Sequence, residues 1–441
     1  MPLTLVPFAG LRYSPDAVPD LSVVMTPPYD VIGAEQRQGY LAAHAYNMIH
    51  LILGAEHAQD SDEENRFTRA AAFLRQWRRD GVLVRDAQPA LYLYQQDFVL
   101  DTTPMTRRGF ISRVRLEDYQ AQVIFPHEAT LAGPKAELLR LWQACQANLS
   151  PVLALYLDAA HTLDAVFAPV VVQPPHRDVA HWGEGRHRLW VVTDPAVIAS
   201  VQQYMCAKSL VIADGHHRYE TALALRDRMR QHHPQAQTTA AYEYVMMYCA
   251  NVYDPGLVVF PTHRLVQHLP LPEIEAALQH LRDWVHVEVE PRHTQSLERW
   301  QQRLGVRLRA RQGPDSVFAL YAGGDRCYVL TVSAAAARQR VRAAGASDAW
   351  KQLDVSVLHY ALLPTLQALV PGSQPTVTYA GVGDEVLPAV ARGAYDLAVM
   401  MRATPLEQMV AVAMGGERMP PKSTFFYPKL PTGLVINGFD A

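Results

Sequence analysis

Cysteine is scarce in this sequence. The chain has four cysteines, which lie far apart and form no CxxC pair: Cys145, Cys206, Cys249 and Cys327. Zinc ribbons and disulfide-stapled folds need closely spaced or paired cysteines. The cysteine pattern therefore argues against both and favours a reducing compartment.

A strong charge of one sign and a long apolar run are also missing. The formal net charge is -3 at pH 7, so electrostatics does not favour a nucleic-acid backbone as the main partner. No apolar stretch reaches the roughly 18 residues that a membrane helix needs. The first residues also lack the basic and apolar regions of a signal peptide. We expect a cytoplasmic protein that binds neither membranes nor nucleic acids.

Apolar residues make up 49% of the 441 residues, enough for two or three domains with cores. Residues 45–54 form a compact apolar run that predicts a strand, and residues 63–80 have helical spacing. No internal repeat is present. Prolines near residue 270 precede a new helical pattern, so we expect an N-terminal core over 1–270 and a C-terminal α/β domain over 271–441.

The most informative segment is IADGHHRYETAL, residues 212–223. An apolar run precedes it and a helical pattern follows, which predicts a buried strand, a tight turn and a helix. Asp214 suits the helix cap, and Gly215 permits a sharp turn or the close approach of a ligand. The free amides of the first helical turn and the guanidinium of Arg218 then offer donors to an anion.

Three interpretations of this segment compete. In the first, His216 and His217 satisfy local hydrogen bonds in a capped helix. In the second, they bind a metal with Asp214, but adjacent histidines on a helix diverge by about 100° and no HExxH partner is present. In the third, the turn binds phosphate, although the glycine patterns of P-loops and Rossmann folds are absent. The third uses the turn, the helix dipole and Arg218 together.

The strand–DGHHR–helix element resembles the nucleotide-phosphate motif of the ParB/sulfiredoxin-like superfamily, which includes sulfiredoxins, ParB-type CTPases and free serine kinases. The resemblance implies an α/β protein with a ParB/sulfiredoxin-like mixed core and a second α/β C-terminal domain. It also implies that nucleotide phosphates bind at residues 214–218.

Much of the remaining chain is similar to a large, little-characterised bacterial and archaeal family of unknown function. That similarity rests on segments such as PFAGLRY, TPPYDVI, YNMIHLILG, PHEATLAGPK, ADGHHRYETAL and ERMPPKSTFFYPKLPTGLVI.

The activities of the superfamily require different residues. Sulfiredoxin chemistry needs a cysteine inside the phosphate turn, and this turn has none. ParB-type proteins need a DNA-reading helix, and the basic candidate, residues 299–312, has the pattern of a solvated helix face. A kinase needs a turn that holds the nucleotide phosphates, a base near the acceptor hydroxyl and usually Mg²⁺ held by carboxylates. These last requirements fit this sequence best.

Candidates for the catalytic groups lie in two proline-containing segments. Asp30, in TPPYDVIG, is placed where a base or a metal ligand would suit, although an Asx turn explains it equally well. His127 and Glu128, in PHEATLAGPK, are expected on an exposed loop. Lys135 follows and is expected to bind phosphate. Capping of the next helix is the alternative for that loop.

Two further segments carry possible loop contacts to a ligand. His263 and Arg264, in PTHRL, follow an apolar run. A structural role and a role in ligand binding explain them equally well. Arg418, Lys422, Ser423 and Lys429 belong to a tail rich in prolines and aromatic residues. Packing explains such a tail, and a rigid cationic loop that closes over an anion explains it equally.

These features predict a nucleotide-binding protein that uses Mg²⁺ with ATP or ADP. By analogy with free serine kinases, we expect a phosphotransferase acting on a small hydroxylated metabolite, with no residue assigned to a permanently bound metal. A non-catalytic nucleotide-sensing protein and a metal-dependent hydrolase are the alternatives. The acceptor, the choice between ATP and ADP and the oligomeric state are left open.

Overall fold

The computed structural model describes residues 2–130, 132–183, 185–232, 239–271, 274–381 and 383–439. The chain forms two compact units. Unit 1 consists of Met1–Pro126, Thr130–Val258 and Pro428–Ala441, and unit 2 consists of His127–Ala129 and Val259–Tyr427.

This division differs from the expected boundary at residue 270. Strand β14 (His263–Gln267) is paired on both sides within the sheet of unit 2, so the second unit begins before the prolines. The final segment, Pro428–Ala441, belongs to unit 1, where β21 (Asn437–Gly438) pairs with β7 (Ala147–Asn148). Pairing between strands that are distant in the sequence determines where unit 2 begins and where it ends. Prolines indicate only local structure, so they do not reveal this pairing.

Unit 1 is built on a nine-stranded mixed sheet. Its strands are β1 (Leu5–Val6), β4 (Leu91–Leu100), β5 (Thr103–Arg115), β6 (Ile124–Pro126), β8 (Val152–Tyr156), β9 (Arg177–Trp182), β10 (Gly185–Val192), β11 (Leu210–Asp214) and β12 (Tyr244–Asn251). They follow the order β6-β11-β8-β12-β5-β4-β10-β9, with β1 beside β5. The pairs β6–β11 and β8–β12 are parallel. The central strands β8 and β12 are buried along their whole length, as expected for strands covered on both faces.

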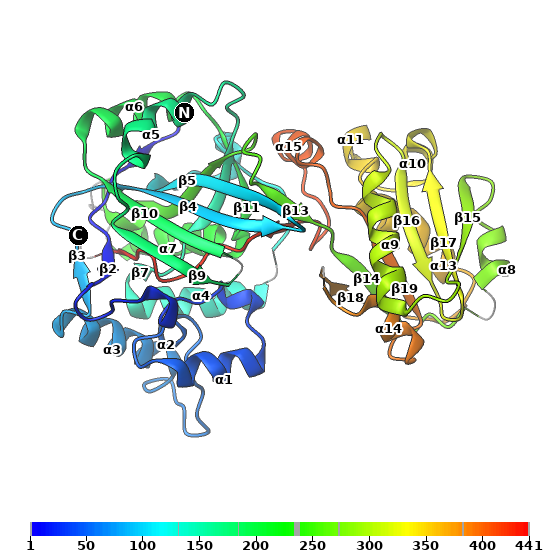
Figure 1. Ribbon diagram of the computed structural model, residues 1–441, viewed down its shortest axis with the longest axis horizontal. Coiled ribbons are helices and arrows are strands. Elements are labelled where there is room, and N and C mark those ends of the chain that lie inside the picture. The colour runs from blue at the N-terminus through cyan, green and yellow to red at the C-terminus, as the bar shows by residue number, and fades with distance from the viewer. Residues whose placement is uncertain are drawn as a thin grey trace. The chain divides into compact units, whose positions relative to one another are not determined.

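Helices cover both faces of this sheet. They are α1 (Ala34–Ala43), α2 (Ile49–Ile52), α3 (Arg66–Arg79), α4 (Ala132–Cys145), α5 (Thr162–Val171), α6 (Pro195–Met205) and α7 (His216–His232), with the 3-10 turns η1 (Leu21–Val23), η2 (Tyr29–Val31), η3 (Tyr119–Ala121) and η4 (Ala241–Glu243). Figure 1 shows α5 and α6 on one side of the sheet and α1 to α4 on the other. Helix α7 packs against α4, β8 and β12.

The N-terminal part of unit 1 tests two expected elements. The helix expected over 63–80 is confirmed as α3, whose cap residue Asn65 accepts hydrogen bonds from the first-turn amides. The strand expected over 45–54 is wrong, because this segment contains the helical turn α2. There Asn47 accepts a hydrogen bond from the amide of Ile49 at 2.9 Å and donates one to the carbonyl of Val23 at 2.9 Å. That side chain favours a turn over an extended strand.

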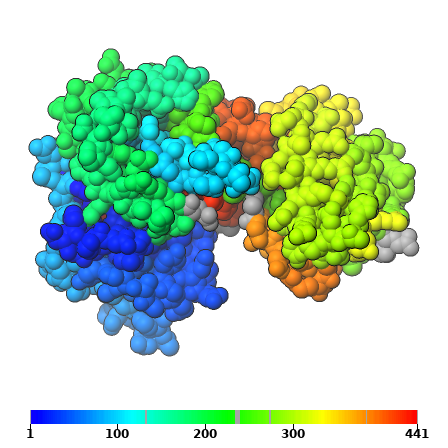
Figure 2. All heavy atoms as spheres, in the orientation of Figure 1, coloured from blue at the N-terminus to red at the C-terminus, as the bar shows by residue number. Residues whose placement is uncertain are grey.

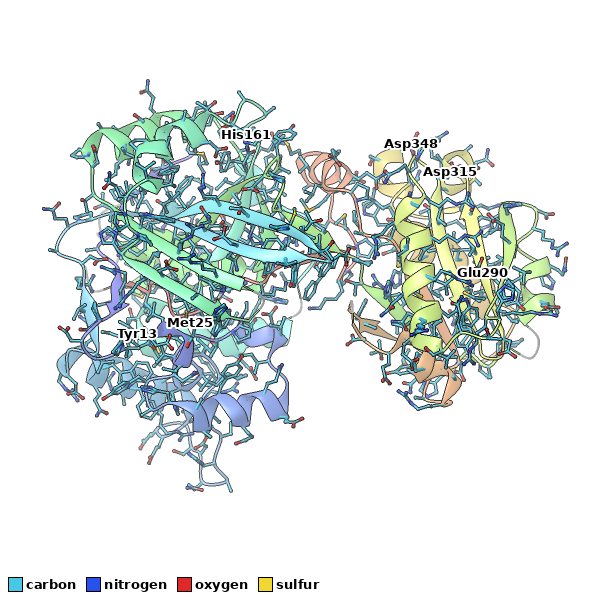
Figure 3. All side chains as sticks on the ribbon, in the orientation of Figure 1. Tyr13, Met25, His161, Glu290, Asp315 and Asp348 are labelled. Carbon is cyan, nitrogen blue, oxygen red and sulfur yellow. The ribbon has the colours of Figure 1, made fainter. Side chains whose placement is uncertain are left out.

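Two buried side chains near this region are labelled in Figure 3. Tyr13, on β2 (Leu11–Tyr13), donates to the carbonyl of Tyr46 at 2.6 Å, and β2 pairs with β3 (Leu83–Arg85). Met25 is fully buried. These contacts tie the start of the chain to the rest of unit 1.

Unit 2 has a six-stranded sheet in the order β15-β17-β16-β19-β14-β18, and its pairs are antiparallel. Its other strands are β15 (Val285–Pro291), β16 (Ser316–Tyr321), β17 (Arg326–Val332), β18 (Thr376–Ala380) and β19 (Leu397–Met401), with a separate pair of β13 (Val258–Phe260) and β20 (Phe425–Tyr427). Its helices are α8 (Ile274–Gln279), α9 (Leu297–Ala310), α10 (Ala334–Arg340), α11 (Asp348–Lys351), α12 (Asp354–Val357), η5 (Leu358–Leu362), α13 (Leu363–Gln367), α14 (Val386–Ala391) and α15 (Leu406–Met414).

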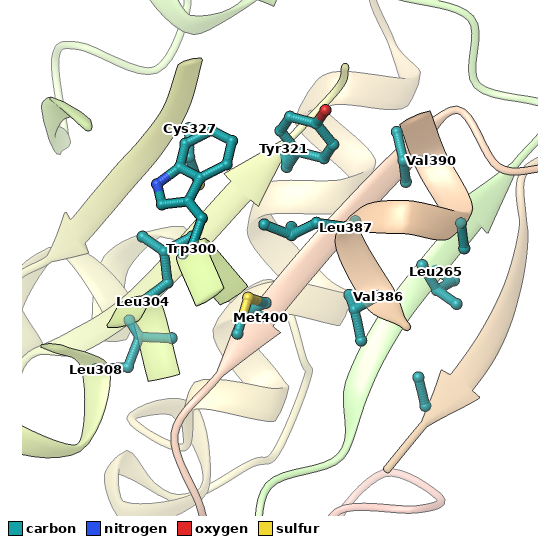
Figure 4. Packing of buried hydrophobic residues seen from close by; sticks show 14 of the residues in the cluster. Leu265, Trp300, Leu304, Leu308, Tyr321, Cys327, Val386, Leu387, Val390 and Met400 are labelled. Carbon is teal, nitrogen blue, oxygen red and sulfur yellow. The ribbon is translucent and has the colours of Figure 1, made fainter. Parts of the chain in front are cut away.

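The core of unit 2 lies between this sheet and the helices α9 and α14 (Figure 4). Trp300, Leu304 and Leu308 recur every fourth residue on α9 and are buried, so they form one helix face. The arginine-rich segment, residues 299–312, overlaps α9 and thus has the amphipathic character expected of it. Its Arg307 pairs with Glu288 and Glu290 of β15.

Both units combine helices with a sheet, so the expected mixed α/β class is confirmed at that level. The ParB/sulfiredoxin-like assignment stays a prediction. Among the described residues, no helix is long and apolar enough to cross a membrane.

Candidate functional site

The segment at Gly215 has the expected strand, turn and helix. Strand β11 is buried up to its last residue, Asp214, and α7 begins at His216. Gly215 between them has a φ of +91°, which favours glycine. A Cβ atom at this position would lie 2.7 Å from Nε of Arg218. The turn therefore requires glycine for its conformation and for its space.

Arg218 differs from the open, ligand-facing fork that the sequence suggests. Its side chain is 4% exposed. Nη1 donates to the carbonyl of Pro151, and Nη2 donates to Oδ2 of Asp214 at 3.3 Å. The reason is local geometry, because the left-handed glycine lets the guanidinium fold back over the turn and meet a carboxylate four residues earlier. Arg218 holds the shape of the turn.

Asp214, the expected cap of α7, lies between two cations. Besides Arg218, its Oδ2 lies 3.5 Å from Nζ of Lys429. Burial would raise the pKa of Asp214, but Lys429, Arg218 and His216 outweigh burial and lower it to about 2. Hydrogen bonds with charged donors are stronger than those with neutral amides, so the two cations hold Asp214 ionised at the start of α7.

Lys429 comes from the final segment of the chain, and its backbone is fixed on the sheet. The carbonyl of Lys429 accepts a hydrogen bond from Nε2 of Gln96 at 3.2 Å, and the preceding carbonyl of Pro428 accepts one from Nη2 of Arg107 at 2.6 Å. Gln96 and Arg107 face each other on β4 and β5. The Lys429 side chain is 17% exposed. The sheet thus positions a cation at the start of α7.

The two histidines of the motif differ in burial. His216 is buried, with 7% exposure, and His217 is half-buried. His216 contributes to the low pKa of Asp214. Both belong to the first turn of α7, as predicted, and their contact with phosphate stays a prediction.

Lys135 lies near the same helix but is paired with a carboxylate. Its Nζ is 2.8 Å from Oε2 of Glu220, one turn into α7, and Oγ1 of Thr130 donates to the same oxygen at 2.6 Å. This ion pair ties the start of α4 to the start of α7. The expected phosphate contact of Lys135 therefore competes with Glu220.

The TPPYD segment reaches the same region. Burial raises the pKa of Tyr29 above its usual range, the adjacent Asp30 raises it further, and Arg218 and Asp214 act on it through their charges. The charged groups of the turn therefore influence the Tyr29 hydroxyl. Asp30 is exposed and lies in the 3-10 turn η2, consistent with either of the two roles expected of it.

His127 and Glu128 belong to unit 2 and are not on an exposed loop, so that expectation is wrong. His127 is fully buried, and its Nε2 lies 2.8 Å from Oγ1 of Thr424. Oε1 of Glu128 accepts hydrogen bonds from the amides of Ser423 at 2.8 Å and Thr424 at 3.2 Å. The carbonyl of His127 accepts one from the amide of Met419 at 2.7 Å. These bonds anchor the tail loop, which brings segments distant in the sequence together.

Arg264 and His263 lie inside unit 2. Arg264 is fully buried and donates to Nε2 of His359 at 3.0 Å, to the carbonyl of Thr262 at 2.5 Å and to the carbonyl of Lys422 at 3.1 Å. Burial lowers the pKa of Arg264 to about 10, so it stays protonated at neutral pH. His263 accepts a hydrogen bond from an amide of β19, and burial lowers its pKa to about 4. Both side chains therefore support the fold.

The remaining tail residues divide between surface and interior. Ser423 is buried, and its carbonyl accepts a hydrogen bond from Oγ1 of Thr404 at 3.1 Å. Arg418 and Lys422 are exposed, and Lys422 has a φ of +57°. The predicted site residues therefore form two groups. One surrounds Gly215 in unit 1, and the other surrounds the loop of residues 418–427 in unit 2.

A metal centre made of protein groups alone does not appear in the part of the chain that the structure describes. There, no three histidine, cysteine, aspartate or glutamate side chains gather as metal ligands.

A family model described as "Protein of unknown function (DUF1015)" matches residues 5–356. The chain belongs to this family. The matched residues include the Gly215 turn, whereas Lys429 and the loop of residues 418–427 lie beyond the match. No curated protein matches the sequence.

Solved structures with a similar arrangement have low scores. A conserved hypothetical protein from Pyrococcus furiosus is 12% identical, with a TM-score of 0.34 over 75% of this chain and 95% of that chain. A free serine kinase in complex with AMP is 12% identical, with a TM-score of 0.32 over 74% and 92%. A variant of free serine kinase in complex with ADP is 11% identical, with a TM-score of 0.33 over the same shares. Scores this low do not inform the chemistry of the site.

Two residues near the turn, Tyr29 and Glu220, are not among those predicted, and Lys429 is expected only as one of the cations of the tail. Tyr29 and Glu220 lie within motifs that the sequence singles out, next to Asp30 and Arg218. Lys429 has no local signal that connects it with Asp214. Only the pairing of the final segment with the sheet brings these two side chains together.

Proposed function

We propose that unit 1 binds the phosphates of a nucleotide at the turn of Gly215, His216, His217 and Arg218. We further propose that the protein transfers a phosphoryl group to a small hydroxylated metabolite. The observation that supports this most is the position of Lys429, a cation from the end of the chain placed at the start of the 17-residue helix α7.

The charges at this turn favour an anion. The first amides of a helix have no partners within the helix and carry partial positive charge. Lys429 adds a full positive charge on a side chain that is 17% exposed. A phosphate group would accept hydrogen bonds from these amides and from this ammonium group. In this arrangement Arg218 maintains the turn, and Lys429, which is more exposed, contacts the ligand.

Asp30 is the proposed acidic group at this site. Mg²⁺ bound with a nucleotide needs only one or two carboxylates, because phosphate oxygens and water complete its shell. An exposed carboxylate next to Tyr29 fits that requirement, and Mg²⁺ would neutralise charge on the phosphates. The same carboxylate is suited to accept the proton of the acceptor hydroxyl.

His127 and Glu128 do not enter the proposed chemistry. Their side chains bind Thr424 and the backbone of the tail loop in unit 2. This observation also favours a second candidate function, a nucleotide-sensing protein without phosphoryl transfer, because it removes two of the three expected catalytic groups.

Phosphorus NMR separates the two candidates. The protein is incubated with Mg²⁺, with ATP or ADP, and with a panel of hydroxy amino acids and other small alcohols. Transfer predicts a new phosphomonoester signal that requires both the acceptor and an intact Asp30, so Asp30→Asn should abolish it. Binding of nucleotide by calorimetry without any new signal would establish sensing, and absence of binding would contradict both.

A further inference from the structure

Two glutamine–arginine pairs lie next to each other on the hairpin of β4 and β5. Gln95 faces Arg108, and Gln96 faces Arg107. Because consecutive side chains of a strand point to opposite faces, the two pairs lie on opposite faces of the sheet. In each pair the guanidinium donates to the glutamine oxygen, from Nε of Arg108 at 3.0 Å and from Nη2 of Arg107. The pairs are therefore alike in their internal hydrogen bond and differ in their surroundings.

Arg107 is buried without a paired counter-charge. It is fully buried, whereas Arg108 is half-buried. In the described part of the chain, Nε and Nη1 of Arg107 have no hydrogen-bond partner, and the acceptors of Nη2 are the neutral Gln96 side chain and the carbonyl of Pro428. The ring of Tyr248 lies 5.9 Å from the guanidinium carbon and offsets part of the cost of burial. Because a buried, unpaired charge destabilises a fold, stability alone does not account for this arginine.

The contacts of Arg107 end on the backbone of the final segment. A guanidinium can only donate hydrogen bonds, so Arg107 fixes the oxygen of the Gln96 amide toward itself and leaves the amide nitrogen for another acceptor. That nitrogen, Nε2, donates to the carbonyl of Lys429 at 3.2 Å, and Arg107 donates to the carbonyl of Pro428 at 2.6 Å. Arg107 and Gln96 thereby hold two consecutive carbonyl groups.

The pair on the opposite face stays within the hairpin. There Gln95 donates to Asp97 of its own strand at 2.7 Å. The final segment, in contrast, continues from Lys429 into residues 430–438, which are buried, and little of this segment, in red, reaches the face shown in Figure 2. Packing thus holds most of the segment, and the buried Arg107 holds its start.

We infer that Arg107 is a positioning residue for the phosphate site, and this inference rests on the proposed function. Through Gln96 and the backbone of residues 428–429, it places the ammonium group of Lys429 at the start of α7, 3.5 Å from Asp214. Arg107 itself does not touch the ligand. A binding group that is displaced by a small distance loses much of its effect, so the loss of Arg107 should act on the ligand through Lys429.

A double-mutant cycle with Arg107→Met and Lys429→Met tests the inference, because such a cycle measures whether two residues act together. Calorimetry with Mg²⁺ and ADP gives the affinity of each variant. Arg107→Met should weaken binding about tenfold when Lys429 is present, and less than twofold when Lys429→Met is already in place. Arg108→Met, the matched variant on the opposite face, should change the affinity less than twofold.

Gln96→Glu separates positioning from stability. The new carboxylate gives Arg107 a counter-charge, but it removes the Nε2 donor and places a negative charge against the carbonyl of Lys429. The melting temperature should therefore stay the same or rise, while the ADP affinity falls about tenfold. A purely structural role of Arg107 predicts retained affinity instead. This variant also replaces Arg107→Met if that protein fails to fold.

The outcomes separate this inference from the proposed function. Equal losses from Arg107→Met with and without Lys429, or unchanged ADP affinity in both Arg107→Met and Gln96→Glu, overturn the positioning role. The phosphate site survives those results if Lys429→Met still weakens ADP binding. A wild-type protein that binds neither ADP nor inorganic pyrophosphate overturns the proposed function and the positioning role with it.

Discussion

The Gly215 turn in unit 1 and the loop of residues 418–427 in unit 2 both gather cations and histidines, but the cations are held differently. Beside the unit 2 loop, the buried Arg264 donates hydrogen bonds to His359 and to two carbonyl groups. His263 and His359 are neutral there because burial lowers their pKa values. At the unit 1 turn, the carboxylate of Asp214 lies between the two cations Arg218 and Lys429, at the start of α7. A donor-rich segment can thus anchor a loop, as in unit 2, or present donors at a helix start, which is where we propose the ligand site.

The largest expected effect concerns the backbone of the unit 1 turn. Gly215→Ala should lower the free energy of unfolding by about 3 kcal/mol, because a φ of +91° is strained for alanine and the new Cβ meets the Arg218 guanidinium. The matched control is Gly81→Ala, at a φ of +70° with open space around it, which should cost only about 1 kcal/mol. Urea unfolding measures both. Equal losses would contradict the close contact with Arg218.

Acid should weaken unit 2 before the unit 1 turn. The pKa values of His263 and His359 are lowered from 6.5 to about 4, so their stability contribution is complete above pH 6.5 and is lost as the pH falls toward 4. The loss at pH 5 is about 2 kcal/mol for the deeply buried His263. The pKa of Asp214 is lowered from 3.8 to about 2, so its contribution is lost only between pH 4 and pH 2.

Hydrogen exchange with mass spectrometry follows both regions through this titration. The amides of residues 397–401, where β19 contacts His263, should exchange faster at pH 5 than chemical exchange alone predicts, and those of residues 215–220 should not. Loosening of the unit 1 turn above pH 4 would contradict the assigned charges.

A smaller effect is expected at the loop anchor. Glu128→Gln removes the charge from the acceptor of the Ser423 and Thr424 amides and should cost about 1 kcal/mol. Those two amides should lose protection from exchange. Nucleotide affinity should stay within twofold, and a larger loss of affinity would assign this loop to the ligand site.

The sequence predicts local structure at the site better than it predicts partners. The buried strand, Gly215 and the helix that follows come from neighbouring residues, so periodicity and turn chemistry report them. The buried state of His127 and Arg264 depends on the tail loop, which returns from a distant part of the chain. The pairing of Lys429 with Asp214 likewise depends on how β4 and β5 hold the final segment.

Short apolar runs show the same limit. Residues 45–54 have the composition of a strand, yet hydrogen bonds of the Asn47 side chain favour a helical turn. The prolines near residue 270 mark the start of a helix but not the limit of the second unit, because the pairing of β14 with β18 and β19 sets that limit.

Calorimetric titration of Mg²⁺ and ADP into the wild-type protein, Lys429→Met and Lys422→Met tests the central claim most directly. Both variants remove one lysine from the same tail, but Lys429 is held at the Gly215 turn and Lys422 is an exposed residue of the unit 2 loop. Lys429→Met should weaken binding ten- to a hundredfold, because the loss of a charge-assisted contact costs about 1.5–3 kcal/mol. Lys422→Met should change the affinity less than twofold. Unchanged affinity in Lys429→Met, or a loss confined to Lys422→Met, would contradict the assignment of the phosphate site to unit 1.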